Sequence, residues 1–150
     1  MYAELENSMT ASQRMIAYTK LELEDELEKP SDEELEERNW PSCGKIEFEK
    51  ATMCYRPQLD PSIKDLSFKT EAGMIVGIVG RTGSGKSSIL QTLFRLAEVS
   101  SGRIVMDGVD IRSVGLHILR KAIAFIPQSP FLIQGTIREN LDPFQVSTDD

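Results

Sequence analysis

Apolar residues recur at helical spacing between residues 4 and 28, a stretch that contains neither proline nor glycine. The positions that share one stripe through a 4-3 repeat are Leu5, Met9, Ser12, Ile16, Thr19 and Leu23. This spacing predicts a helix of about six turns over residues 4–28. Because Ser and Thr occupy two of the six stripe positions, the pattern favours a helix docked against another surface over an autonomous coiled coil.

Pro30 interrupts the helical pattern, and the segment that follows it, SDEELEERN, is strongly acidic with a single apolar residue. Such a composition predicts a solvated linker or a short frayed helix. We therefore expect a helix in residues 1–29, an acidic linker in 30–42 and a folded domain in 43–150. The boundary of this domain lies near Trp40.

Short runs rich in Val, Ile, Phe and Tyr begin after the linker. The runs IEFEKATMCY (46–55) and SIKDLSFKT (62–70) alternate in polarity, and the turn-rich RPQLDP separates them. This arrangement predicts two antiparallel strands. In the second run one face would carry Ile63, Asp65 and Ser67, and the other Lys64, Leu66 and Phe68.

The segment MIVGIV (74–79) is apolar at every side-chain position and predicts a strand covered on both faces. It leads into glycines and then into SSILQTLFRL (87–96), whose apolar residues have helical spacing. The order therefore predicts a strand, a loop and a helix. Further short strands are expected at 103–108 and 123–128, and short helices at 116–122 and 136–141. The final STDD contains residues typical of a helix start, which indicates a truncated domain.

The composition narrows the class of protein. The net charge is -7, with a balance of -8 over residues 1–39 and +1 over 40–150, so we expect no nucleic-acid partner. The longest apolar stretch, Met74 to Gly80, is much shorter than the roughly 20 residues of a membrane span. The N-terminus lacks the features of a secretory signal, which predicts a cytosol-like compartment. Cys43 and Cys54 lack metal-ligand spacing and are expected to be reduced thiols.

A phosphate-binding loop is predicted after the 74–79 segment. The sequence matches GxxxxGK[ST] through Gly80, Arg81, Thr82, Gly83, Ser84, Gly85, Lys86 and Ser87, and we add Ser88 to the expected nucleotide-binding set. Glycines allow backbone N–H groups to turn toward one point, and the start of a helix adds its positive dipole end. Lys86 can reach β- and γ-phosphoryl oxygens, while the Ser87 hydroxyl can coordinate Mg²⁺. These residues by themselves indicate a P-loop nucleotide-binding protein.

Several further motifs occur in order around this loop: GRTGSGKSSIL, SGRIVMDGVDI, GLHILR and IPQSPFLIQGTIRENLDPF. Together they resemble the ATP-binding cassette of an ABC transporter of the C subfamily, the multidrug-resistance-associated type, and its second cassette more than its first. The resemblance is strong over about 40–150. It implies an α/β P-loop NTPase fold of ABC type, with an antiparallel β subdomain and the start of the nucleotide-binding core. Residues 4–40 resemble, more weakly, the end of the last membrane helix and the connector.

The resemblance implies roles for two residues outside the loop. Tyr55 matches the aromatic residue that stacks on adenine, although a tyrosine at a strand end can also serve the core. Gln128 matches the Q-loop glutamine, which contacts Mg²⁺ and the attacking water and whose loop touches the membrane domain. With Lys86, Gln128 is the candidate catalytic residue, and with Ser87 it is the candidate metal ligand.

Two other signals are assigned to structure. The run Ile104 to Asp107 has the form of a strand ending in a metal-binding Asp, but Gly108 follows, and Asp-Gly predicts a hairpin turn. His117 is the single histidine. In the family alignment it belongs to GLHxLR and precedes the place of the switch histidine.

The resemblance also implies a function for the whole protein, namely binding of Mg-ATP between two cassettes and export of a substrate across a membrane. Its partners would be a second nucleotide-binding domain and membrane domains, at the cytoplasmic face. The signature motif, the strand ending in Asp-Glu and the switch histidine do not occur in this sequence, so we expect the 150 residues alone to be inactive in hydrolysis. The alternatives are a non-catalytic nucleotide-binding or interaction fragment and a soluble P-loop enzyme. A GTPase would require an NKxD motif, which this sequence lacks.

Overall fold

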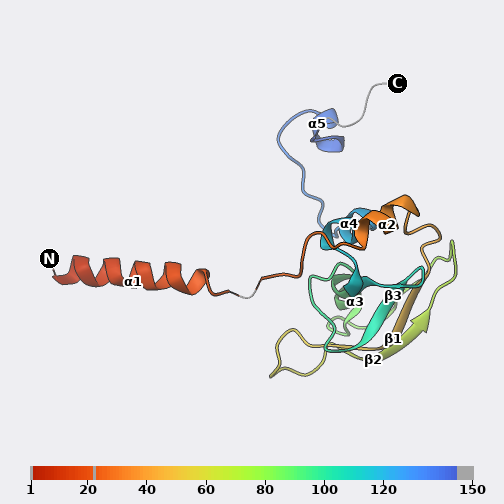
Figure 1. The fold of residues 1–150 in the computed structure, drawn as a ribbon, viewed down its shortest axis with the longest axis horizontal. Coiled ribbons are helices and arrows are strands. Elements are labelled where there is room, and N and C mark those ends of the chain that lie inside the picture. The colour runs from red at the N-terminus through yellow and green to blue at the C-terminus, as the bar shows by residue number, and fades with distance from the viewer. Residues whose placement is uncertain (1, 22, 145–150) are drawn as a thin grey trace.

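The computed structural model describes the backbone of residues 2–21 and 23–144, and the side chains of 9–21 and 23–144 (Figure 1). The helices are α1 (Tyr2–Tyr18), α2 (Asp32–Glu37), α3 (Lys86–Leu93), α4 (Leu116–Ala122) and α5 (Ile137–Leu141), with a 3-10 turn at Ile111–Ser113. The strands are β1 (Ile46–Met53), β2 (Ile63–Lys69), β3 (Ser101–Met106) and β4 (Val109–Asp110).

The four strands form one antiparallel sheet in the order β2-β1-β3-β4. This result confirms the strands that were predicted at 46–55, 62–70 and 103–108. It also confirms the Asp-Gly turn, because Met106 pairs with Val109 and the two turn residues both have positive φ.

The Asp107 carboxylate in this turn is fully engaged with backbone. It accepts hydrogen bonds from the N–H groups of Cys43, Gly44 and Lys45 at 2.8–3.0 Å. Partial burial opposes ionisation of Asp107, but hydrogen bonds from the backbone of residues 42–45 outweigh it and lower the pKa of the carboxyl. The residue therefore ties the entry of β1 to the β3–β4 turn.

The alternation that was predicted for the second strand holds only in part. Asp65 has φ +47°, and the β1–β2 register shifts between Ala51 and Met53, whose partners Leu66 and Ile63 are three residues apart. An irregularity of this kind displaces the pleat by one position. As a result Ile63 and Leu66 pair with Met53 and Ala51, which are both buried, while Asp65 is exposed, so the prediction that Ile63 shares a face with Asp65 is wrong.

The core lies between one face of this sheet and the helices. Phe48 and Ile104 from the sheet are each at most 2% exposed, as is Leu119 from α4. Phe48 also stacks on Phe68, with ring centroids 4.6 Å apart. The buried members of the cluster are Leu35, Phe48, Ala51, Leu93, Ile104, Met106, Ile111, Val114 and Leu119. Helix α3 is thus anchored to the β subdomain by its C-terminal turn.

The acidic segment after Pro30 is more than a solvated linker. It forms α2, as the alternative of a short helix predicted, and the single apolar residue Leu35 is buried in the core. Asp32 is also buried, and its carboxylate accepts hydrogen bonds from the N–H groups of Lys29 and Gly115. The helix therefore packs on the domain through one face.

The predicted helix over 4–28 is wrong beyond Tyr18, where α1 ends. Residues 24–29 instead lie against the domain. The carboxylate of Asp25 accepts hydrogen bonds from Lys29 at 2.5 Å and from Arg95 at 2.7 Å, and these bonds hold the pKa of Asp25 well below its usual range. The carbonyls of Glu26 and Leu27 accept hydrogen bonds from α4. Residues 23–29 form neither helix nor strand, so the docked segment is irregular.

Helix α1 projects away from the domain (Figure 1), and its side chains from Met9 to Tyr18 are exposed. No helix in the described part of the chain has the length and hydrophobicity that a bilayer crossing requires.

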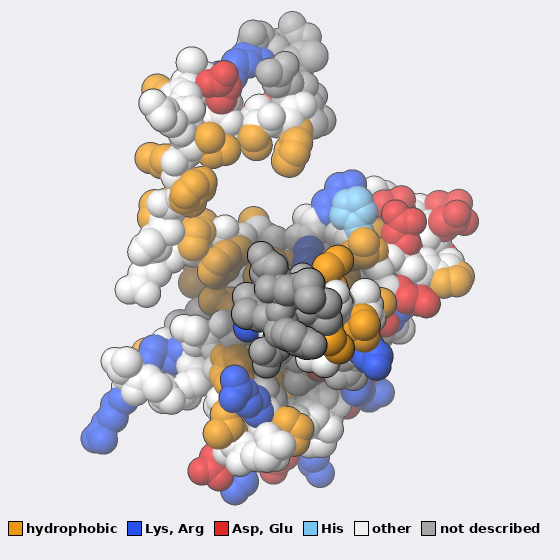
Figure 2. Space-filling view, turned by 90° about the vertical axis from the view of Figure 1, so that its left-hand side faces the viewer, with side chains coloured by type: hydrophobic (Ala, Val, Ile, Leu, Met, Phe, Trp, Pro, Cys, Tyr) orange, Lys and Arg blue, Asp and Glu red, His pale blue; other side chains and the backbone are white. Residues whose placement is uncertain are grey.

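Two predicted strands are absent from the described residues. Ile75 and Val79 in the 74–79 segment are each 97% exposed, and Ile126 in the 123–128 segment is 91% exposed. A central strand is stable only when neighbours pair with both of its edges and cover its faces. The four-stranded sheet provides no such neighbour for either segment. Figure 2 shows hydrophobic side chains along the C-terminal arm that carries α5, standing apart from the body.

Candidate functional site

The predicted phosphate-binding loop leads directly into α3, which begins at Lys86. Gly83 and Gly85 have φ values of +81° and +85°, a region in which side chains are strained. At Gly85 a Cβ atom would also lie 2.4 Å from the carbonyl oxygen of Ser62. The loop therefore requires glycine at position 85 for two reasons: the backbone has a positive φ, and a side chain would clash with Ser62.

The Lys86 ammonium lies within the curve of its own loop. Its Nζ donates hydrogen bonds to the carbonyl oxygens of Gly80 at 2.8 Å and Arg81 at 2.6 Å. Ser84 closes the same turn by donating its N–H to the Arg81 carbonyl. An anion that enters the loop would compete with these neutral carbonyls for the ammonium, and charge favours the anion.

The first turn of α3 adds further donors. The N–H groups at the start of an α-helix have no acceptor within the helix, and the positive end of the helix dipole lies at the same place. Ser87 presents an exposed side chain on this turn, whereas Ser88 is only 6% exposed. The loop and the helix start together form an anion-binding arrangement.

A cavity of about 490 Å³ brings the predicted site residues together. It is lined by Tyr55, Ser62, Thr82, Gly83, Gly85, Lys86, Ser87, Ser88 and Gln128. Segments that are far apart in the sequence thus meet at the N-terminus of α3. Gly80, Arg81 and Ser84 do not line the cavity, and they instead shape the loop and hold Lys86.

Tyr55 reaches this cavity from the segment that follows β1. Its side chain is 50% exposed, so one part of the ring is open to solvent. The hydroxyl lies 2.9 Å from Ser88 Oγ and donates a hydrogen bond to Gln91 Oε1 at 2.5 Å. Both partners are on α3. Sequence reasoning missed Gln91, although its spacing of three residues from Ser88 places the two on one face of the helix.

Gln128 lines the same cavity, but its local structure differs from the prediction. It does not follow a strand, and it is exposed. A second, mainly apolar cavity of about 360 Å³ joins it to the C-terminal half of α3, with Phe94 and Phe125 in edge-to-face contact at 5.6 Å. This contact keeps the 125–128 segment beside the loop.

The described residues contain no group of three His, Cys, Asp or Glu side chains placed to hold a metal ion. The candidate ligands are the Ser87 hydroxyl and the Gln128 amide oxygen, which are neutral. These oxygens suit Mg²⁺, which retains water and takes its anionic ligands from substrate phosphates. The donor set therefore fits a magnesium ion that arrives with a nucleotide.

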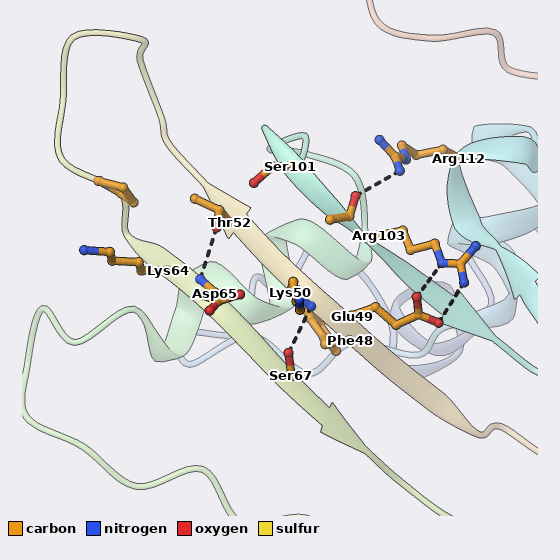
Figure 3. A pocket seen from close by; sticks show the side chains of 12 residues that line it. Phe48, Glu49, Lys50, Thr52, Lys64, Asp65, Ser67, Ser101, Arg103 and Arg112 are labelled. Atoms are coloured by element: carbon orange, nitrogen blue, oxygen red, sulfur yellow. Dashed lines mark hydrogen bonds and ion pairs between the residues drawn. The ribbon is translucent and has the colours of Figure 1, made fainter.

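A larger cavity, about 920 Å³, lies elsewhere, on the outer face of the sheet (Figure 3). Arg103 is paired there with Glu49 at 2.6 and 3.0 Å, and Arg112 donates to the Gly102 carbonyl. The site residues that were predicted from the sequence do not line this cavity. This cavity is lined mostly by residues of strands, and no α-helix of the described chain begins at it. It therefore lacks the helix-start N–H groups that are found at the loop, and its greater volume does not make it the nucleotide site.

His117 lies on α4, outside the loop cavity. Its ring is exposed, with Nδ1 4.0 Å from a carboxylate oxygen of Glu28. The assignment of His117 to structure stays a prediction.

Comparison with known proteins adds independent information. Residues 63–150 match the family described as ABC transporter. The chain is 46% identical over 98% of its length to ABC transporter C family member 2 of Dictyostelium discoideum. It is 51% identical over 98% to ABC-type transporter cicA of Emericella nidulans, and 42% identical over 100% to ATP-binding cassette sub-family C member 2 of Homo sapiens. The chain spans only 10–11% of the length of these relatives.

Proposed function

Because this chain belongs to the ABC transporter family, and within it to the C subfamily, we propose that it binds Mg-ATP as part of a nucleotide-binding domain. The observation that carries this proposal is the cavity at the start of α3, in which Tyr55, the glycine loop, Lys86 and Gln128 meet. A polyphosphate would lie in the loop, and the base would extend toward Tyr55.

Each group has a distinct task in this proposal. Lys86 exchanges the carbonyls of Gly80 and Arg81 for phosphoryl oxygens, and the first-turn N–H groups of α3 bind the remaining charge. Ser87 and Gln128 would hold Mg²⁺, which neutralises charge on the phosphates. Gln128 would also orient the attacking water.

In the whole protein we propose that ATP binding and hydrolysis drive substrate export across a membrane. A second nucleotide-binding domain would complete the site, and membrane domains would receive the movement at the cytoplasmic face. Positioning of the nucleophile is as necessary as charge neutralisation in phosphoryl transfer. The 150 residues supply mainly the second, so we propose that alone they bind ATP but hydrolyse it inefficiently.

Residues 1–29 are proposed to connect a membrane domain to the cassette. The exposed α1 supports this proposal, because its large apolar side chains Met9, Met15, Ile16 and Tyr18 are each more than half exposed. The segment that follows α1 is fixed to the domain through Asp25 and Arg95. A movement of the segment that follows α1 would therefore be transmitted to the domain.

The direct test is titration of the 150-residue chain with ATP in the presence and absence of Mg²⁺. Saturable binding of one nucleotide, strengthened by Mg²⁺, is the expected result. Absence of binding at millimolar ATP would contradict the proposal.

Replacement of Tyr55 tests the adenine part of the site. We expect Tyr55→Ala to weaken ATP binding about tenfold, because base–aromatic stacking contributes roughly 1–3 kcal/mol. Binding of inorganic triphosphate should change less than about twofold, since it has no base to stack. Equal losses for both ligands, measured by isothermal titration calorimetry, would remove the adenine assignment.

A further inference from the structure

We propose that Gln91 on α3 is a positioning residue for the nucleotide base, which it serves by holding the hydroxyl of Tyr55. The inference rests on the proposed function, because it extends the ATP site that Tyr55 and the loop would form. Its basis is the pair of hydrogen bonds that joins the Tyr55 hydroxyl to Gln91 and Ser88.

The direction of these bonds follows from the donors available. Gln91 Oε1 is an acceptor, so the one hydroxyl proton of Tyr55 is donated to it. The phenol oxygen then accepts from the Ser88 hydroxyl, 2.9 Å away. The Tyr55 hydroxyl thus donates one hydrogen bond and accepts another, and both bonds fix this end of the ring to α3.

The burial of the three side chains supports a positioning role. Ser88 is 6% exposed and Gln91 is partly buried, whereas Tyr55 is 50% exposed. The hydroxyl end is therefore anchored in the protein while part of the ring stays open to solvent. This combination suits a ring that offers a face to a flat ligand.

Tyr55 needs such an anchor because of its place in the chain. Residues 55–61, which follow β1, are all exposed, and the 54–62 segment contains no helix or strand. A tyrosine in a loop of this kind loses side-chain freedom when it stacks on a base. Hydrogen bonds to α3 order the side chain in advance, so less entropy is lost on binding.

The same helix carries both parts of the site. Lys86 begins α3 at the phosphate loop, and Gln91 lies five residues further along. At 1.5 Å per residue this is about 7.5 Å along the helix axis. The position of the aromatic ring is thereby set relative to the phosphate loop, which favours a nucleoside triphosphate over a triphosphate without a base.

Ser88 and Gln91 contribute differently to this arrangement. Ser88 belongs to the expected nucleotide-binding set, so a change at Ser88 would alter phosphate and phenol contacts together. Gln91 does not line the loop cavity. Gln91 also lines the second, mainly apolar cavity with Ser87 and Gln128, so titration with inorganic triphosphate separates the hold on Tyr55 from an effect on those two residues.

The experiment compares Tyr55→Phe, Gln91→Met and the double variant in titrations with Mg-ATP and with inorganic triphosphate. Tyr55→Phe retains the ring and loses both hydrogen bonds, and we expect ATP affinity to fall about fivefold. Gln91→Met retains length and helix propensity and should lower ATP affinity about threefold. The double variant should be no weaker than Tyr55→Phe, because both changes remove the same contact. Triphosphate affinity should stay within about twofold throughout.

Gln58→Met, at an exposed position in the segment after β1, is the matched control and should bind both ligands as the wild type does. Wild-type ATP affinity in Tyr55→Phe or Gln91→Met, alongside a loss in Tyr55→Ala, would overturn the role of Gln91 and leave the stacking assignment intact. Additive losses in the double variant would also overturn it. Failure of the wild type to bind ATP would overturn both proposals, and this outcome is seen before any variant is measured.

Discussion

Lys86→Ala is expected to lower the affinity for Mg-ATP by roughly two orders of magnitude, because one member of a close charge pair is then missing. In the present structure the ammonium is held 2.8 Å from the Gly80 carbonyl and 2.6 Å from the Arg81 carbonyl. It is therefore already within the loop and needs only a small movement to reach a phosphate. Its removal leaves neutral N–H groups to bind a multiply charged anion.

The loss should affect inorganic triphosphate as strongly as ATP, because Lys86 acts on the phosphates. Lys64→Ala, on β2 and exposed, provides the control for a general effect of net charge and should leave both affinities unchanged. Calorimetric titration at fixed ionic strength is the measurement, since salt weakens exposed charge interactions. Retention of wild-type ATP affinity by Lys86→Ala would contradict the assignment of the loop.

Gly85→Ala is expected to lower the affinity for both ATP and triphosphate on the order of a hundredfold. Residue 85 has φ +85°, and a Cβ atom there would lie 2.4 Å from the backbone carbonyl oxygen of Ser62. The backbone must shift to relieve this contact, and a displacement of about 1 Å at such a site can cost a hundredfold. The N–H groups at the start of α3 would no longer point at one position.

Gly83→Ala separates the effect of the backbone conformation from the effect of a steric clash. Gly83 has a similar φ of +81°, but a Cβ atom there would meet nothing within 4 Å. Its cost is therefore limited to the left-handed conformation, about 1–2 kcal/mol, and binding should fall only severalfold to about tenfold. Equal losses in the two variants would show that contact with Ser62 is not what fixes the loop.

The contact at Ser62 also links the phosphate loop to the antiparallel subdomain. Ser62 directly precedes β2, and its N–H donates to the Met53 carbonyl at the end of β1. Tyr55 follows the same strand end. Both ends of the β1–β2 connection therefore lie against the start of α3, Ser62 beside Gly85 and Tyr55 beside Ser88.

A second set of contacts holds the C-terminal end of α3. Arg95 is buried and binds Asp25, Glu98 and the carbonyls of Ile111 and Val114. Arg120 binds Glu24 through two hydrogen bonds. Glu24 and Asp25, which the spacing placed in the helix over 4–28, thus hold the domain together through partners 96 and 70 residues later in the chain.

The sequence by itself determined several of the local elements and the motif of the loop. The runs 46–55 and 62–70, the Asp-Gly turn and the GxxxxGKS motif could be read because strand alternation, turn geometry and phosphate binding depend on neighbouring residues. Helices α4 and α5 were likewise predicted from local spacing. The order of motifs placed the chain in its family.

Only the tertiary structure decided where distant groups meet. The contact of Tyr55 with Gln91, the placement of Asp25 beside Arg95 and the burial of Leu35 depend on packing between segments that no periodicity relates. The same dependence explains the two strands that the sequence predicted at 74–79 and 123–128 but that did not form. A β-strand takes its hydrogen bonds from its neighbours, whereas a helix satisfies its own, so hydrophobicity alone could not establish them.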